Sequence, residues 1–146
     1  MTVHKLAEME RKYLDASPEV KERLSKRIER GPMGQLVKQA NRFRCQLCAA
    51  LELEPIAFKK TNGEPYVEAH HVMPVSMEQA GSLSVSNIMI LCANHHRQMH
   101  YGNVSVAIDG SQFHVTVDGR SIRVARTRPS DPSMRLRIKT SQGVVG

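Results

Sequence analysis

The sequence predicts an α+β fold, in which N-terminal helices precede a small metal-binding core and a C-terminal antiparallel β meander. Three observations predict this order. Apolar residues recur at helical spacing up to residue 44, cysteines and histidines at metal-ligand spacing occupy 45–102, and apolar and polar residues alternate from 103 onward. With 146 residues, of which 40% are hydrophobic, we expect a single domain over 1–146.

The N-terminal region, 1–44, is predicted to form three helices, over residues 4–15, 18–30 and 34–42. The second has the clearest boundaries, because Ser17 is a suitable N-cap, Pro18 takes the first helical position and Gly31 is a typical stop. The third helix leads directly into the first cysteine pair.

The central region reads as strand, loop, strand and helix. Tyr66 to His70 forms a short strand, Met77 to Val85 a loop, and Ile88 to Leu91 a second, apolar strand. Ala93 to His100 is helical in character and is ended by Gly102.

The C-terminal region, 103–146, alternates apolar and polar residues in three runs, which predicts a three-stranded meander. Asp109-Gly110 and Asp118-Gly119 provide the turns between the runs. Residues 127–133 read as a linker, and 134–140 alternate apolar with basic residues, as either a strand with one basic face or a basic tail.

The charge indicates a polyanionic partner. The chain has 21 Lys and Arg against 14 Asp and Glu, a net charge of +7, and an isoelectric point near 9.7. The flanks, 1–44 and 105–146, hold 18 of the basic residues and nine of the acidic ones, so the positive excess surrounds a slightly acidic centre. This distribution suits flanking segments that contact phosphates around a central cation-binding site. No apolar run follows Met1 and no stretch could span a bilayer, so we expect a cytoplasmic protein without a membrane partner.

The cysteines point to a structural zinc site. Their odd number, three, argues against a disulfide framework. Cys45-x-x-Cys48 has the spacing of a zinc knuckle, and Cys92-x-x-His95 repeats it downstream. Together these four residues would form a closed tetrahedral Cys3His site, which is the structural kind.

The remaining histidines form a second group. His96 and His100 are four residues apart, so on a helix both imidazoles project from one face and can share an ion. Zinc binding by Cys92 and His96 is compatible with the same spacing, although it would leave His100 without a helical partner. On a strand, His70 and His71 point to opposite sides, so one of them can face the His96 and His100 pair while the other serves a different purpose.

These motifs, taken in order, resemble the HNH endonuclease family, whose core is the ββα-metal finger. The resemblance rests on EAHHVMPVS (Glu68 to Ser76), Asn87 in SVSNIMILC, HHRQMH (His95 to His100) and the upstream Cys45-x-x-Cys48. The resemblance covers roughly residues 43–102. Within the family, the sequence is similar to the His-His variant with a structural zinc knuckle.

The resemblance implies a role for each matched residue. His71 would be the general base that activates the attacking water, and the amide of Asn87 would brace the loop between the strands. A catalytic divalent ion would be held by His70, His96 and His100. Because His70 stands where many members have an aspartate, Zn²⁺, Ni²⁺ or Mn²⁺ suits this donor set better than Mg²⁺.

The expected activity is metal-dependent hydrolysis of DNA phosphodiester bonds, in restriction of foreign or modified DNA. The alternative is a non-catalytic zinc-stabilised module that binds nucleic acid, which would leave the second histidine group without a purpose. Cutting both strands requires two active sites, which favours a homodimer. The candidate DNA contacts are Arg42, Arg44, Arg97, Arg120 and Arg123.

Overall fold

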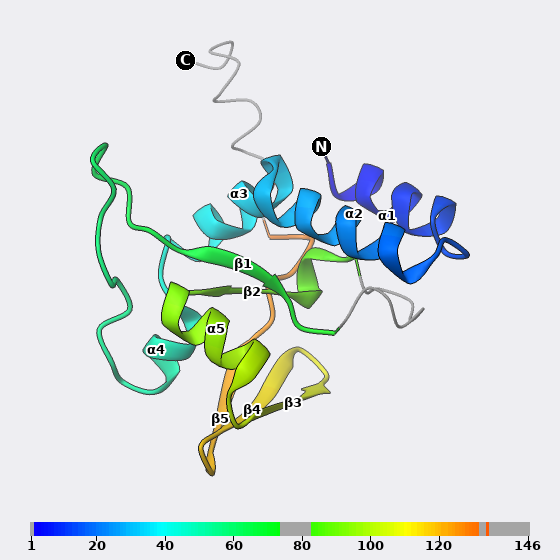
Figure 1. Cartoon of the computed structure of the whole chain (residues 1–146). Coiled ribbons are helices and arrows are strands. Elements are labelled where there is room, and N and C mark those ends of the chain that lie inside the picture. Colours follow the sequence, from blue (N-terminus) through cyan, green and yellow to red (C-terminus); the bar gives the residue numbers. More distant parts are fainter. Residues whose placement is uncertain (1, 74–82, 132–133, 135–146) are drawn as a thin grey trace.

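The N-terminal helices lie on one side of a two-stranded β hairpin, and the last helix and a three-stranded sheet lie on the other side (Figure 1). The structure is a computed structural model that describes residues 2–73, 83–131 and 134. The helical elements are α1 (Val3–Lys12), α2 (Pro18–Arg30), α3 (Pro32–Ala40), α4 (Gln46–Ala50), η2 (Val85–Asn87) and α5 (Ala93–Tyr101). The strands are β1 (Glu68–His71), β2 (Ile88–Leu91), β3 (Val104–Asp109), β4 (Gln112–Val117) and β5 (Arg120–Ala125). The predicted α+β class is confirmed.

The boundaries of α2 agree with the sequence prediction. The Ser17 hydroxyl accepts a hydrogen bond from Val20 N at 3.3 Å, Pro18 occupies the first turn, and Gly31 ends the helix. Helix α1 ends earlier than predicted, at Lys12, and α4 was not predicted as a helix.

Helix α3 begins two residues before its predicted start, because Gly31 is at once the C-cap of α2 and the N-cap of α3. The predicted first residue, Gly34, has a packing role instead. A Cβ built on it would lie 2.0 Å from the carbonyl oxygen of Glu29, so only glycine permits this close approach of α3 to the end of α2.

The hairpin of β1 and β2 divides two hydrophobic cores. The strands pair antiparallel, with His70 opposite Met89 and His71 opposite Ile88. Strand β2 is buried on both faces: Ile88 and Ile90 join the core beneath α1, α2 and α3. Met89 and Leu91 join a second core made with the cysteines and the C-terminal sheet. The hairpin therefore has one face toward the N-terminal helices and one toward α5.

The predicted meander forms a sheet in the order β3, β4, β5, all antiparallel. Asp118 and Gly119 both have positive φ, 47° and 84°, as a tight hairpin turn requires. Arg126 ties the end of this sheet to the core: its guanidinium donates to Ser86 O and Gly110 O, each at 2.9 Å, and lies over the Phe113 ring. The position of η2, just before β2, is thus fixed by the C-terminal sheet.

Two predicted segments fall largely outside the described residues. They are the loop at 77–85, of which residues 83–85 are described, and the strand or basic tail over 134–140, of which residue 134 is described. Within the described residues, no helix has both the length and the apolar character needed to cross a membrane.

Candidate metal centres and active site

Two helix N-termini bring the cysteines together. Cys45 is the N-cap of α4 and Cys92 is the N-cap of α5, and each Sγ accepts the backbone N–H three residues on, from Cys48 at 3.3 Å and from His95 at 3.4 Å. In each pair, the first residue is therefore the N-cap and the second is the third residue of the helix. This spacing turns the two side chains of a pair toward the same point. All four residues are buried.

The distances within this cluster fit a tetrahedral zinc ion. The Nδ1 atom of His95 lies 3.5 Å from Cys45 Sγ, 3.2 Å from Cys48 Sγ and 3.5 Å from Cys92 Sγ. Cys48 Sγ and Cys92 Sγ are 3.9 Å apart. Bond lengths of zinc to sulfur and nitrogen in a regular tetrahedron would give edges of about 3.8 Å between sulfurs and about 3.6 Å between sulfur and nitrogen. The measured separations are close to these values, and all four donor atoms lie within 4.8 Å of one another, so the cluster can hold a metal such as zinc.

The electrostatics of the thiols also favour a bound cation. Burial, followed by the charge of neighbouring cysteines, raises the pKa of the Cys48 thiol, and burial raises that of Cys45. Three thiolates in one buried site repel each other unless a divalent ion neutralises them, so the set is suited to a metal rather than to nucleophilic chemistry.

The second cluster lies between β1 and α5. One donor atom from each of His70, His96 and His100 lies within 4.8 Å of the others, and their rings are in mutual contact, with centroids 4.9 to 5.0 Å apart. His96 Nε2 and His100 Nε2 are 3.3 Å apart, which suits two ligands of one ion. His70 is buried, His96 is partly exposed and His100 is exposed, so this cluster opens to solvent while the cysteine cluster is closed.

The protonation state of His70 suits metal binding. Burial, followed by the charges of His96 and His100, lowers the pKa of His70 to about 3. A neutral imidazole is the form that binds a metal, so His70 is ready to do so at neutral pH.

Glu68 contacts one member of the triad, His96, and was not assigned a role from the sequence. Its Oε1 lies 2.7 Å from His96 Nδ1, and its Oε2 accepts the Tyr66 hydroxyl at 2.5 Å. With Nδ1 of His96 held by a carboxylate, Nε2 carries the lone pair that faces His100. A sequence signal existed, because residues two apart on a strand share a face, so Glu68 and His70 must project to the same side.

His71 faces the opposite side of β1, toward α2. Its Nδ1 lies 2.9 Å from Glu29 Oε2 and 2.8 Å from Ser25 Oγ, and its backbone N–H donates to the same Glu29 oxygen at 3.1 Å. Burial works to raise the pKa of Glu29, but its hydrogen bonds with His71 and the charge of that ring outweigh burial and lower it. The other ring nitrogen, Nε2, is buried and has no hydrogen-bond partner among the described residues. The side chain of His71 is 2% exposed.

Asn87 holds the chain just beyond β1. Its Oδ1 accepts from Met73 N and its Nδ2 donates to Met73 O, both at 2.9 Å, while its backbone oxygen accepts from Val72 N at 2.8 Å. Asn87 is completely buried. These bonds fix the path of the chain within two residues of His71.

The five arginines predicted to contact DNA are all exposed, but they lie on different elements. Arg97 is on α5 beside the triad, Arg42 and Arg44 lie between α3 and α4, and Arg120 and Arg123 lie on β5. Arg123 is paired with Asp109, with Nη1 and Oδ2 2.8 Å apart. Arg97 is thus the member of this set that lies next to the candidate chemistry.

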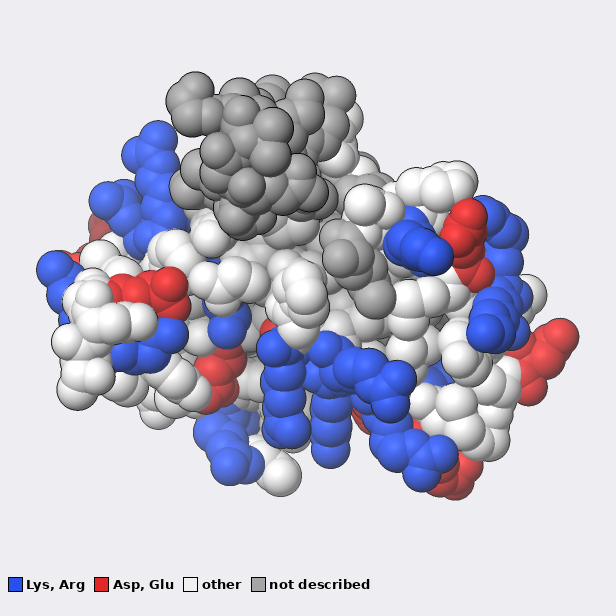
Figure 2. Space-filling view, turned by 90° about the horizontal axis from the view of Figure 1, so that it is seen from above, with Lys and Arg blue, Asp and Glu red and all other residues white. Residues whose placement is uncertain are grey.

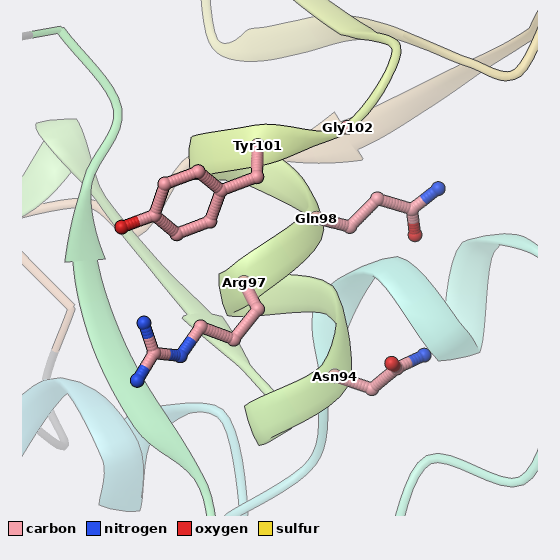
Figure 3. A pocket seen from close by; sticks show the side chains of 5 residues that line it. All are labelled: Asn94, Arg97, Gln98, Tyr101 and Gly102. Atoms are coloured by element: carbon pink, nitrogen blue, oxygen red, sulfur yellow. The ribbon is translucent and has the colours of Figure 1, made fainter.

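The surface around α5 and α2 carries further groups suited to a polyanion. Figure 3 shows a shallow hollow on α5, where Arg97 and Tyr101 point to one side and Asn94 and Gln98 to the other. Tyr101 is 80% exposed. Figure 2 shows Lys and Arg side chains side by side along one edge of the face formed by the N-terminal helices. Helix α2 has four exposed basic residues on one face, Arg23, Lys26, Arg27 and Arg30.

An antiparallel hairpin, a following helix and a histidine triad between them, braced by a buried asparagine, define a ββα-metal domain. Residues 45–107 match the family described as HNH endonuclease. Over 81 residues the chain is 36% identical to the Type IV methyl-directed restriction enzyme EcoKMcrA of Escherichia coli strain K12. That match covers 55% of this chain and 27% of the relative. No solved structure matches the chain significantly.

Proposed function

We propose that the chain is a metal-dependent endonuclease that hydrolyses DNA phosphodiester bonds. The observation that carries the proposal is the second histidine cluster. A module that only bound nucleic acid would need the cysteine cluster for stability, but it would have no use for three converging imidazoles that open to solvent beside a carboxylate. Open coordination positions are a property of catalytic sites, whereas structural sites are closed.

The proposed ligands of the catalytic ion are His70, His96 and His100. When bound, a divalent ion supplies a Lewis acid for a phosphate oxygen and for the leaving 3′ oxygen. The donor set contains imidazoles and no direct carboxylate, since Glu68 is engaged with Nδ1 of His96. This composition favours Zn²⁺, Ni²⁺ or Mn²⁺ over Mg²⁺.

The proposed general base is His71. With Nδ1 directed at Glu29 and Ser25, the lone pair is on Nε2, which is buried and lacks a protein partner among the described residues. Nε2 is thus the ring nitrogen that can accept a proton from the attacking water. As the oxygen of this water attacks phosphorus, Nε2 takes its proton, the bond from phosphorus to the 3′ oxygen breaks, and the 3′ oxygen takes a proton from solvent water. The products carry 5′-phosphate and 3′-hydroxyl ends.

His71→Ala is expected to lower the rate of DNA cleavage by about 10²- to 10⁴-fold, the usual contribution of a general base. The measurement is nicking of supercoiled plasmid in the presence of Mn²⁺, Ni²⁺, Zn²⁺ or Mg²⁺, with a chelator as blank. His114, which lies on β4 in the C-terminal sheet, provides the control variant His114→Ala.

Two outcomes of that assay would count against the proposal. Undiminished cutting by His71→Ala would remove His71 from the mechanism. Absence of nicking by the wild-type protein with every metal would instead favour the non-catalytic zinc module.

Arg97 and Tyr101 are proposed to hold the DNA on either side of the scissile phosphate. Arg97 would do so by its charge, and Tyr101 by contacts of its uncharged ring. Arg97→Gln should weaken binding and reduce the slope of log affinity against log salt by about 0.9, the value for one phosphate contact. Tyr101→Ala should weaken binding without changing the slope, because an aromatic ring stacks or packs but carries no charge. Fluorescence anisotropy with a labelled duplex, measured over a range of salt concentrations, gives both quantities.

Gln98→Ala is the matched control for this pair, since Gln98 points to the other side of α5 and donates to Asp118 at 2.9 Å (Figure 3). If Arg97→Gln left the slope of log affinity against log salt unchanged, Arg97 would contact solvent and not a DNA phosphate.

Restriction of foreign or modified DNA is the proposed biological role, supported by the similarity to EcoKMcrA, whose name describes a methyl-directed restriction enzyme. Sequencing the ends produced from modified and unmodified genomic DNA tests this role. Preferential cleavage of modified DNA supports it, and equal cleavage of both contradicts dependence on modification. Cutting both strands at one place would need two copies of the triad, which a homodimer would supply.

A further inference from the structure

We infer that Glu29 on α2 is a positioning residue for His71, so that a helix outside the HNH segment completes the active site. The inference rests on the proposed function, because it assigns Glu29 to act through the proposed general base. Glu29 precedes the matched segment, 45–107, and is separated from His71 by 42 positions along the chain.

The first argument is the geometry of one carboxylate oxygen. Glu29 Oε2 lies 2.9 Å from His71 Nδ1, accepts the backbone N–H of His71 at 3.1 Å and accepts the Ser25 hydroxyl at 3.3 Å. The Glu29 side chain is 16% exposed, so water competes little for this oxygen. The carboxylate therefore fixes both the backbone and the ring of His71.

The second argument is the tautomer that this arrangement selects. An ionised carboxylate has no proton to donate, so the hydrogen between Glu29 and His71 must belong to Nδ1. The Ser25 hydroxyl gives its hydrogen to Glu29 and leaves its oxygen, 2.8 Å from Nδ1, to share the same ring proton. Nε2 is then the nitrogen with the free lone pair, which is the form that a general base requires.

The third argument is that the same contact continues to act after proton transfer. When Nε2 takes the proton of water, the ring becomes an imidazolium, and the Glu29 carboxylate 2.9 Å away stabilises that positive charge. No proton needs to reach Glu29. The backbone of Glu29 lies at the junction of α2 and α3, where Gly34 closely approaches its carbonyl oxygen.

The experiment is a double-mutant cycle with wild type, Glu29→Gln, His71→Ala and the double variant, in which kcat and KM for DNA cleavage are measured. We expect Glu29→Gln to lower kcat by about 10- to 100-fold, as loss of an orienting carboxylate typically does, with KM nearly unchanged. In the His71→Ala background the same change should have no further effect, because a residue that acts through His71 has nothing left to orient.

Two variants guard against a merely structural explanation. Glu22→Gln changes an exposed glutamate of the same helix and should leave kcat unchanged. Ser25→Ala removes the hydroxyl that contacts both the ring and the Glu29 carboxylate, and the expected loss of kcat is roughly 2- to 10-fold. Should Glu29→Gln fail to fold, the cycle is carried out with Ser25→Ala in its place.

A spectroscopic readout is independent of activity. Long-range ¹H–¹⁵N correlation spectra of the zinc-loaded protein should show the His71 proton on Nδ1 in the wild type. A proton on Nε2 would overturn the inference.

The outcomes of the cycle separate this inference from the proposed function. A loss of kcat by Glu29→Gln of equal size in both His71 backgrounds would overturn the positioning role and leave the nuclease proposal intact. Inactive wild-type protein, or full activity of His71→Ala, would overturn the proposed mechanism and the role of Glu29 with it.

Discussion

His95→Ala is expected to lose the structural metal and with it the folded core. Three buried thiols would remain around a missing fourth ligand, next to the core that contains Met89, Leu91 and Phe113. Zinc binding in small zinc-finger peptides is worth about 10–16 kcal/mol, which is comparable to the entire stability of a typical domain, about 5–15 kcal/mol. The measurements are zinc content by elemental mass spectrometry and thermal unfolding by circular dichroism.

The control for this variant is His4→Ala, because His4 is a largely exposed histidine on α1. Its zinc content and melting temperature should equal those of the wild type. A His95→Ala protein that retained stoichiometric zinc and melted at the wild-type temperature would contradict the assignment of His95 to the cysteine cluster.

His96→Ala, one residue further along the same helix, is expected to fold, retain the structural zinc and lose cleavage. Its ring belongs to the partly exposed triad and contacts His70 and His100, so its removal leaves the buried cysteine cluster intact. A bound ion acting as a Lewis acid contributes several kcal/mol, so cleavage should fall by about 10³-fold or more. Plasmid nicking gives the activity, and calorimetric titration with Mn²⁺ gives the binding at the triad.

Comparison of His95→Ala with His96→Ala tests the presence of two separate sites more strictly than either variant alone. Loss of zinc and unfolding in both variants would show that the two clusters are one structural unit. Full cleavage by a folded His96→Ala protein would remove the triad from the chemistry. We expect an unstable His95→Ala protein and a stable but inactive His96→Ala protein. This pattern requires that two faces of α5 contribute to two different sites.

Much of the arrangement could be predicted from local spacing. The N-cap spacing of Cys45 and Cys48 and of Cys92 and His95 defines two half-sites, and the structure brings them together. Helical spacing pairs His96 with His100, and strand alternation sends His70 and His71 to opposite sides. These patterns are periodic, so they can be recognised without knowledge of how the chain folds over longer distances.

The contacts that the sequence did not reveal join segments that lie far apart in the chain. Glu29 and Ser25 meet His71 across more than 40 positions, and Arg126 reaches Ser86 across 40. No periodic pattern connects such residues, and on α2 the charge of Glu29 looks like that of the exposed glutamates around it. Helix α4 was also missed, since five residues are too few for a recognisable apolar period.

His70 and His71 face different elements because neighbouring side chains on a strand point to opposite sides. Side chains on β1 alternate between the α5 face and the α2 face, so a slip of one residue against β2 would exchange the two imidazoles. Both rings would still be present, and the composition of the site would be unchanged, but each would face the other's partners. The paired hydrogen bonds between Asn87 and Met73 oppose such a slip at the end of the hairpin. Asn87 therefore acts like a marker of the reading frame of the strand, because its bonds favour the register in which His70 faces α5 and His71 faces α2.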